Sequence, residues 1–379
     1  DYIVEPEMGC DVYTSIDVHL QDVATTALER QLIQHDAAWG TVILMEVSTG
    51  YIKAIANLSR DEEGGSYSES HNKAIAELVE PGSTFKLPVM MAVFDDGLFN
   101  LGDSIDTGDG IHYFYDRSMK DSNYKRDGSG GNGILSVEEV FEKSSNIGTA
   151  LLVKKAYGDN PQKFLNRLGA MGLQESLGIK IKGEQKPQLY SKVGEGNWSG
   201  LSLTQMAIGY EVLQTPLQTL AFYNAVANNG VLVRPQFVTE VRKNGKTIQT
   251  NPPIVLRSRI CSPSTLEKCR KMLEGVCEAG GTADYIFKGA PYSVAGKTGT
   301  AKIAKMNGYY ADRYRASFVG YFPAEAPKYS CLVLINDTRS GVYYGSTIAG
   351  PVFRELADKI YATEFELRGS DPESDLAQA

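Results

Sequence analysis

A serine followed three residues later by a lysine is the spacing in this chain that first indicates nucleophilic chemistry, because both side chains then lie on one helix face. A lysine that loses its proton can activate the neighbouring hydroxyl as a nucleophile. Ordinary composition produces roughly one or two such pairs by chance in a chain of this length. The spacing occurs three times, at Ser70/Lys73, Ser83/Lys86 and Ser122/Lys125.

The Ser83/Lys86 pair differs from the other two in its surroundings. The turn-forming dipeptide Pro81-Gly82 precedes it, and the apolar run that follows predicts a buried helix. A serine at the start of that helix meets unpaired N–H groups and the positive end of the helix dipole. Burial would also lower the pKa of Lys86 and favour its neutral, basic form. On this spacing alone, a capping serine and a lysine with an exposed ammonium remain the default interpretation.

Two further segments change that balance. Ser144 and Asn146 lie in a predicted tight turn between two helices, and Lys297-Thr298-Gly299-Thr300 lies on a predicted strand. Taken singly, Ser144 and Asn146 are residue types that are common in turns, and residues 297–300 fit an exposed strand edge. Together with Ser83 and Lys86, they resemble in order the S-x-x-K, S-x-N and K-T-G motifs of penicillin-binding proteins and serine β-lactamases. We refer to them as the first, second and third motifs.

Acyl transfer requires a nucleophile, a base, a route for the proton and groups that hold the acyl donor. Ser83 and Lys86 are the candidates for the first two roles. The Ser144 hydroxyl can pass a proton to the leaving amine, and the Asn146 amide can hydrogen-bond the amide backbone of a substrate. A second cation, Lys297, near Lys86 would depress the pKa of Lys86 further.

The third motif is expected to hold the substrate. Lys297, Thr298 and Thr300 offer a cation and hydroxyls suited to a carboxylate. Gly299 has no side chain, so a substrate can lie close to the strand edge. The backbone N–H groups of Ser83 and Thr300 are candidates for an oxyanion hole. No metal is expected, because the four histidines are scattered and no zinc-ligand spacing occurs.

The elements around these residues predict an α/β chain with strands at both ends. Helices are expected near residues 16–32, 72–79, 264–279 and 350–365, and in most of 90–230. Strands are expected near 41–47, 51–57, 294–302, 316–322 and 329–337, with a loop at 303–315. We therefore predict one sheet formed from both ends of the chain and a helical subdomain inserted between them.

Composition excludes several broad classes. The chain has 379 residues, 42% of them apolar, which is enough for a substantial core. Its formal net charge of −8 argues against nucleic-acid binding, and its apolar runs are too short to cross a membrane. Five cysteines, an odd number, exclude a complete disulfide framework. Because the first residue is Asp1 rather than Met, we expect a fragment or a processed form.

Segments around the three motifs resemble the transpeptidase domain of class B penicillin-binding proteins, in particular the septal, cell-division type. The likeness covers nearly the whole chain and is carried by residues 80–86, 143–148, 296–301 and 316–323. Tyr210-Glu211-Val212 departs from the smaller residues expected after Ile208-Gly209, which puts the local packing there in question.

The resemblance implies a penicillin-binding/serine β-lactamase-like fold: a mainly antiparallel five-stranded sheet flanked by helices, with an inserted all-helical subdomain at roughly 90–230. Residues 16–365 would form the transpeptidase domain, 1–15 a lead-in linker and 366–379 a disordered tail. Ser83 would attack a D-Ala-D-Ala peptide of peptidoglycan, release D-alanine and form an acyl-enzyme that an amine of a neighbouring stem peptide resolves. β-Lactams would acylate Ser83, and no cofactor is implied.

The resemblance also implies partners and a location. Peptidoglycan stem peptides would serve as D-Ala-D-Ala donor and amine acceptor. Divisome membrane proteins, among them a glycosyltransferase, would be partners during division. An N-terminal anchor, absent from this chain, would hold the catalytic domain at the inner membrane, facing the periplasm.

Three alternatives stay open. A class A β-lactamase would need a deacylating carboxylate, and the nearby glutamates do not have the expected spacing from the second motif. A D,D-carboxypeptidase would differ only in letting water resolve the acyl-enzyme. A non-catalytic β-lactam sensor or divisome scaffold belongs to another class, but sensors typically carry an apolar residue in place of Asn146.

Overall fold

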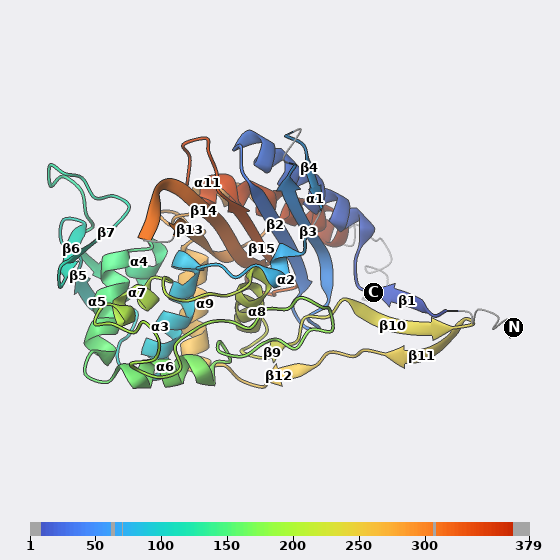
Figure 1. The fold of residues 1–379 in the computed structure, drawn as a ribbon, viewed down its shortest axis with the longest axis horizontal. Helices are drawn as coiled ribbons and strands as arrows, with labels where there is room; N and C mark the ends of the chain where they lie inside the picture. Colours follow the sequence, from blue (N-terminus) through green and yellow to red (C-terminus); the bar gives the residue numbers. More distant parts are fainter. Residues whose placement is uncertain (1–8, 62–64, 70, 306–307, 367–379) are drawn as a thin grey trace, which may run out of the picture.

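The largest element of the fold is a six-stranded antiparallel sheet to which both ends of the chain contribute. A computed structural model describes residues 9–61, 65–69, 71–305 and 308–366. The strand order is β13-β14-β15-β2-β3-β4 (Figure 1). The strands are β13 (Ala295–Lys305), β14 (Gly308–Phe322), β15 (Tyr329–Asn336), β2 (Trp39–Glu46), β3 (Ile52–Arg60) and β4 (Tyr67–Glu69).

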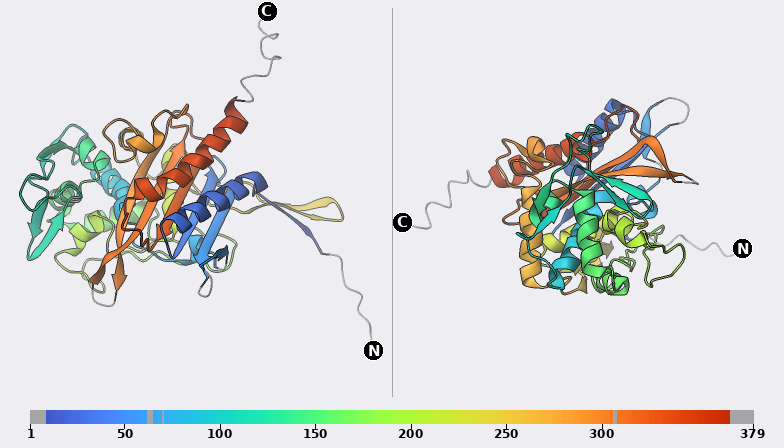
Figure 2. Two further views of the ribbon diagram at one scale, coloured as in Figure 1. Left: turned by 90° about the horizontal axis from the view of Figure 1, so that it is seen from above. Right: turned by 90° about the vertical axis from the view of Figure 1, so that its left-hand side faces the viewer.

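Helices cover both faces of this sheet. α1 (Val18–Gln34) and α12 (Gly350–Ile360) lie side by side over one face (Figure 2). α8 (Pro216–Ala227) packs against the other face and is buried along its whole length. The central strand β15 is therefore buried at every position, which explains why its sequence is nearly continuously apolar rather than alternating.

The sheet has six strands where the sequence predicted five. The additional strand, β4, has three residues in a polar stretch, which is too short for an apolar alternation to reveal it. It pairs with β3, and its Tyr67 hydroxyl donates to the carbonyl oxygen of Ala37 at 2.7 Å. Main-chain pairing and this side chain hold the strand, rather than the burial of a hydrophobic face.

The described parts of the segment predicted as a loop at 303–315, residues 303–305 and 308–315, instead extend the ladder between β13 and β14. Lys302 pairs with Tyr314, and Ala304 pairs with Tyr309. The hairpin projects past the body of the sheet (Figure 2), and its described residues from 302 to 314 are exposed or half-buried. Its residues therefore lack the apolar pattern by which a strand is predicted.

Between β4 and β9 (Leu232–Val233) most of the regular elements are helices, but the prediction of an all-helical subdomain is wrong in one respect. Two short ribbons occur there, β5 (Ser104–Asp106) with β8 (Ile134–Ser136) and β6 (Ile111–Phe114) with β7 (Arg117–Lys120). This stretch is rich in Gly, Asp and Ser, so backbone pairing organises it without a clear hydrophobic period. The helices are α2 (Lys73–Ala76), η1 (Gly82–Phe85), α3 (Lys86–Asp95), α4 (Val137–Glu142), α5 (Asn146–Tyr157), α6 (Pro161–Ala170), α7 (Ser202–Ala207) and α8.

Within the lead-in predicted over 1–15, residues Asp11–Thr14 form the strand β1. β1 (Asp11–Thr14) pairs with β10 (Val238–Lys243), which pairs with β11 (Lys246–Thr250), and this ribbon extends away from the body (Figure 1). Pairing with a segment more than 200 residues away cannot be read from the local sequence. Residues 1–8 lie outside the described part of the chain.

The C-terminal helix α12 continues into the π-helical segment η2 (Tyr361–Glu366), and the remainder of the predicted tail, 367–379, lies outside the described residues. In the described ranges, none of the helices combines the length and the apolar character that a membrane span requires. The remaining elements are β12 (Val255–Arg257), α9 (Pro263–Gly275), α10 (Asp284–Phe287) and α11 (Gly345–Ile348).

Candidate active site

Ser83 lies in the short turn η1, which leads directly into α3. Gly82 adopts a φ of 56°, and its N–H donates to the carbonyl oxygen of Gly209 at 3.1 Å. A Cβ atom on Gly82 would lie 3.0 Å from the Cβ of Ala301, so η1 packs closely against β13. Ser83, which is half-buried, therefore lies where the start of a buried helix meets the strand of the third motif.

Lys86 connects the first motif to the second. Its side chain is fully buried, and Nζ donates to the carbonyl oxygen of Ser144 at 2.7 Å. Nζ also lies 3.2 Å from Ser144 Oγ and 2.8 Å from Asn146 Oδ1. Burial lowers the pKa of Lys86 to about 7, while the carboxylate of Asp121 opposes part of that shift. Within the described residues, the acceptors of Lys86 Nζ all belong to the second motif, and Ser83 Oγ is not among them.

The second motif occupies the tight turn between α4 and α5. Ser144 has a φ of 56°, which few residues other than glycine adopt. Ser145 is the N-cap of α5, and its Oγ accepts the N–H of Gly148 at 2.9 Å. The Asn146 amide contacts Lys86 through Oδ1 and donates from Nδ2 to the carbonyl oxygen of Lys120 at 3.0 Å. A substrate that bonds the Asn146 amide would therefore share it with these protein partners.

Asp121, in the loop after β7, positions the second motif and was missed by the sequence analysis. Its side chain is 5% exposed, and Oδ1 accepts the N–H groups of Asn146 at 2.7 Å and Ile147 at 3.0 Å. Oδ2 accepts from Ser145 Oγ at 2.7 Å and from Asn132 Nδ2 at 3.3 Å. The carboxylate thus completes the N-terminus of α5, whose own first turn holds no acidic residue. Other helices, such as α1 and α8, also lack an acidic residue in their first turn, so the sequence carried no specific signal for this distant partner.

Replacing Asp121 with asparagine is expected to lower the free energy of unfolding by about 1–3 kcal/mol, because buried donors at the start of α5 lose a charged acceptor. Urea denaturation followed by circular dichroism would measure this. The matched control is Asp127→Asn, since Asp127 is exposed and accepts only local hydrogen bonds from Ser129. Equal, small losses for both variants would show that Asp121 does not support the turn.

Lys297 is fully buried, which differs from the expectation that it presents a cation to a carboxylate. Nζ donates to the carbonyl oxygen of Thr298 at 3.2 Å and lies 5.5 Å from the centre of the Phe141 ring. Burial first, and then repulsion from Lys86, lowers the pKa of Lys297 well below its ordinary value. Burial is thus the main cause for both lysines, and two ammonium groups in one dry pocket also repel each other, which favours their neutral forms.

Gly299 is required for packing, and not only for the substrate approach that the sequence predicted. A Cβ atom there would lie 2.2 Å from Ser317 Oγ on β14 and 3.0 Å from the Cγ2 atom of Thr84 in η1. Any side chain would therefore push β13 away from the turn that carries Ser83. The position of Gly299 on the strand fixes the distance between the first and third motifs.

The hydroxyls of the third motif already have protein partners. Thr298 Oγ1 lies 2.9 Å from Thr282 Oγ1, and Thr300 Oγ1 accepts the N–H of Gly345 at 3.3 Å. β13 is an edge strand of the sheet, so one side of its main chain is left for an added strand. The predicted site residues thus meet at one place, at the start of α3, the turn before α5 and the free edge of β13.

Comparison with known proteins identifies the family. The model of the penicillin binding protein transpeptidase domain matches residues 40–358. The probable peptidoglycan D,D-transpeptidase PenA of Neisseria gonorrhoeae is 29% identical over 382 residues, which cover 99% of this chain and 60% of PenA. The peptidoglycan D,D-transpeptidase FtsI of Escherichia coli K12 is 29% identical over 356 residues, which cover 92% of this chain and 55% of FtsI. The chain thus spans little more than half the length of these relatives.

A solved structure agrees with this assignment. The transpeptidase domain of Burkholderia pseudomallei penicillin-binding protein 3 superposes with a TM-score of 0.75 at 27% identity, covering 93% of this chain and 96% of that one. The matched region contains all three motifs, each on the kind of element that the sequence predicted. The chain belongs to the penicillin-binding protein transpeptidase family.

Proposed function

We propose that this chain is the catalytic part of a peptidoglycan D,D-transpeptidase that crosslinks stem peptides through an acyl-enzyme on Ser83. The observation that carries the proposal is the buried Lys86, which joins the serine turn to Ser144 and Asn146 through three short contacts. A lysine with a pKa of about 7 is half neutral at neutral pH, so it can accept the proton of a serine and later return it.

The acylation step uses only groups of this chain. Ser83 Oγ attacks the carbonyl of the penultimate D-alanine and gives its proton to Lys86, while the N–H groups of Ser83 and Thr300 hold the carbonyl oxygen as it becomes negative. The C–N bond then breaks, and the leaving D-alanine takes a proton that Lys86 supplies through the Ser144 hydroxyl. The product is an ester between Ser83 and the shortened donor peptide.

The second half-reaction reverses these roles. An amine from a neighbouring stem peptide attacks the ester carbonyl and loses a proton to Lys86 by the same route. The C–O bond to Ser83 then breaks, and Ser83 Oγ takes the proton back from Lys86 as the new amide forms. Thr298, Gly299 and Thr300 hold the donor along the edge of β13. Lys297 contributes at its carboxylate end, where a bound anion would favour the charged form of this lysine.

The relatives support this activity and a role in septal cell-wall synthesis, since FtsI of E. coli and PenA of N. gonorrhoeae are named as D,D-transpeptidases. Because the chain covers about 60% or less of those proteins, we propose further segments, a membrane anchor, divisome partners and a periplasmic location for the whole protein. We also propose that residues 16–365 form one transpeptidase domain with a helical subdomain at roughly 90–230.

β-Lactamase activity is the nearest alternative, and the carboxylates offer it little support. Three glutamates have structural roles instead: Glu139 completes the cap of α4, and Glu184 accepts three N–H groups of one loop. Glu195 likewise accepts the N–H groups of Ser191 and Lys192. None of these contacts brings a free carboxylate to Ser83.

Intact-protein mass spectrometry after addition of benzylpenicillin tests the proposal. We expect one adduct that persists for hours, because β-lactams imitate D-Ala-D-Ala and the ester lacks an efficient water-activating base. M. tuberculosis penicillin-binding protein 3, which is 25% identical and has a TM-score of 0.80, is known in complex with ampicillin. An adduct that clears within seconds would favour a β-lactamase, and the absence of any adduct would favour a scaffold.

A further inference from the structure

A small cavity of about 160 Å³ lies among the helices between β4 and β9, and the acylation chemistry leaves it without a role. It is enclosed by the turn after β6, by the C-terminal half of α5 and by the segment 198–204, which runs into α7. Three aromatic residues, Phe114, Tyr115 and Trp198, are part of its lining. Pockets that hold a drug-sized ligand measure roughly 300–1,000 Å³, so this one accommodates a single ring of a larger ligand.

Tyr115 holds an exposed ring at the edge of this cavity. Its side chain is 72% exposed, and its φ of 56° is one that few residues other than glycine and asparagine adopt. The ring lies over Gly200, where an added Cβ atom would be 3.4 Å from two of the ring carbons. A tyrosine in this conformation costs energy and buries little surface, which favours a role in binding over one in folding.

Polar groups accompany the rings. Nζ of the exposed Lys154 lies 5.4 Å from the centre of the Phe114 ring and 5.4 Å from that of the Tyr115 ring. These rings attract its charge, and none of the described residues accepts a hydrogen bond from it, so its N–H groups remain for a ligand. Thr204 Oγ1 donates to the carbonyl oxygen of Leu201 at 2.8 Å and can still accept a hydrogen bond.

This combination suits a sugar ring. A pyranose has an apolar face of C–H groups, which packs on an aromatic ring, and an edge of hydroxyls, which need donors and acceptors. A purely apolar ligand would leave the Lys154 ammonium without a partner in a partly dry site. An isolated anion would pair with Lys154 but would make no use of the flat rings.

Packed residues connect the cavity to the catalytic motifs. Phe114 belongs to a buried hydrophobic cluster whose other members are Met119, Ile147, Ala150 and Ile208. Tyr210 packs on this cluster, and its hydroxyl accepts the N–H of Lys302 on β13 at 3.2 Å. The large residue that departs from the family pattern at 210 therefore links the helices around the cavity to the strand of the third motif.

The separation between the cavity and the second motif fits the length of a stem peptide. A helix rises about 1.5 Å per residue, so Lys154 lies roughly 12 Å along α5 from Asn146. The four residues of a five-residue donor stem that precede the reacting bond span roughly 13–14 Å when extended. The glycan strand that carries the stem is thus within reach of the cavity while the reacting carbonyl is at Ser83.

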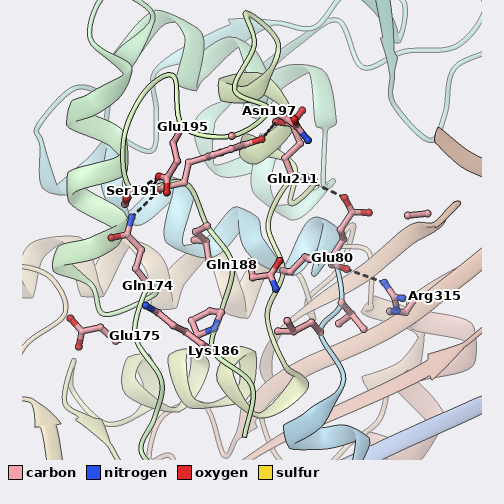
Figure 3. A pocket seen from close by; sticks show the side chains of 18 of the residues that line it. Glu80, Gln174, Glu175, Lys186, Gln188, Ser191, Glu195, Asn197, Glu211 and Arg315 are labelled. Carbon is pink, nitrogen blue, oxygen red and sulfur yellow. Dashed lines mark hydrogen bonds between the residues drawn. The ribbon is translucent and has the colours of Figure 1, made fainter. Parts of the chain in front are cut away.

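A single loop separates the small cavity from a larger one beside the active site. Glu195 and Asn197 line the larger cavity, of about 1200 Å³, on the side opposite Glu80 (Figure 3). Trp198, the next residue, lines the small cavity instead. A substrate that extends from Ser83 across the open space would therefore meet this loop and then the aromatic rings beyond it.

We propose that this small cavity binds one N-acetylated sugar ring of the glycan strand that carries the donor stem. The sugar packs against the rings of Tyr115 and Trp198, and the Lys154 ammonium donates to a hydroxyl or to the acetamido carbonyl oxygen. This inference rests on the proposed transpeptidase function, which supplies the glycan, and it adds a substrate contact far from the reacting bond.

The fluorescence of Trp198 tests the binding without the reaction. The chain has two tryptophans, and the other, Trp39, is buried in β2, so Trp39→Phe leaves Trp198 as the reporter. A tetramer of N-acetylglucosamine is expected to change the emission of this variant and of the wild-type protein saturably, with a Kd of about 1 mM. A response that does not saturate, and that Tyr115→Asn shares, would overturn the proposal.

Two thioester donors test the contribution to catalysis. They share one stem peptide with a reacting D-alanyl thioester, and one of them also carries the disaccharide of N-acetylglucosamine and N-acetylmuramic acid. Attack by Ser83 releases a thiol, and kcat/KM follows from its colorimetric detection. We expect the disaccharide to raise kcat/KM by about two- to tenfold, the range that one added aromatic contact provides.

Three variants locate the contact. Tyr115→Asn, whose new side chain tolerates a positive φ, should fold and lose the advantage of the disaccharide donor, whereas Tyr115→Phe, which keeps the ring, should retain it. Tyr113→Asn is the matched control, because Tyr113 is exposed on the same ribbon but does not line the cavity. The ratio between donors is taken within one variant, so a general loss of fold or of Ser83 reactivity cancels.

The outcomes distinguish the sugar contact from the function on which it rests. Equal kcat/KM for the two donors in the wild-type protein, with release that depends on Ser83, would overturn the contact and leave the transpeptidase proposal standing. An advantage that survives in Tyr115→Asn would equally place the contact outside this cavity. Saturable binding of the tetramer that Tyr115→Asn abolishes, with no release from either donor and no penicillin adduct, would support the sugar site and overturn the transpeptidase function.

Discussion

Replacing Ser83 with alanine is expected to abolish the penicillin adduct and to lower thiol release from a D-alanyl thioester by at least about 10⁴-fold. The oxygen that forms the ester is absent, and no neighbouring group replaces it in an acyl-enzyme mechanism. The change is small and half-buried, so the fold is expected to persist. Intact-protein mass and a continuous thiol assay would measure the two losses on the same sample.

Ser122→Ala is the matched control for this variant, because Ser122 and Lys125 have the same spacing but lie in an exposed loop. It should form the adduct at the wild-type rate. An adduct that survives in Ser83→Ala, or one that disappears in Ser122→Ala, would move the nucleophile away from η1 and contradict the proposed mechanism.

Replacing Lys86 with alanine is expected to slow acylation by about 10²–10⁴-fold, because the base that accepts the serine proton is lost. The substitution also leaves Ser144 and Asn146 without a shared donor, so thermal unfolding must be recorded alongside the rate. Lys125→Ala is the control for removing a lysine at the same spacing in a loop. A variant that folds but acylates at the wild-type rate would show that another group takes the proton.

The pH profile of the wild-type protein tests the same residue without a substitution. Because burial lowers the pKa of Lys86 to about 7, the neutral form should rise from roughly a tenth at pH 6 to roughly nine tenths at pH 8. The acylation rate should therefore increase with pH through this range and then level off. Stopped-flow acylation by a chromogenic β-lactam would measure the profile.

Asp121→Asn extends this test, since the carboxylate of Asp121 raises the pKa of Lys86 against the effect of burial. Removing that negative charge should move the midpoint of the profile to lower pH. A midpoint that shifts upward, or a wild-type rate independent of pH between 6 and 8, would mean that Lys86 is not the group that titrates.

The local sequence was enough to predict the elements that carry the three motifs. Pro81-Gly82 before an apolar run predicted the turn and the buried helix at Ser83. Neighbouring residues likewise account for the capping box at Ser136 and for the tight turn that follows α4. The long apolar strands of the sheet were predicted for the same reason, because burial on both faces is visible in composition. Turn and helix propensities and the spacing of apolar residues depend on a few neighbouring residues, so they can be read directly from the sequence.

The tertiary structure decided what depends on residues that are distant in the chain. Asp121 contacts the second motif from the loop after β7, and the residues around position 145 do not indicate that Asp121 is their partner. The short strand β4, the ribbons β5–β8 and β6–β7, and the pairing of β1 are held by main-chain hydrogen bonds that leave no apolar pattern.

The protonation of the charged groups in the site also depends on residues that are distant in the chain. Motif resemblance predicted that Lys86 and Lys297 share a site, but only the structure shows that both side chains are fully buried and that burial is the main cause of their lowered pKa values. The sequence therefore indicated which residues are the candidates for the chemistry and on which elements they lie. The structure determined their protonation, their supports and the cavity beside them, because desolvation and charge coupling depend on which atoms surround a group in space and not on its neighbours along the chain.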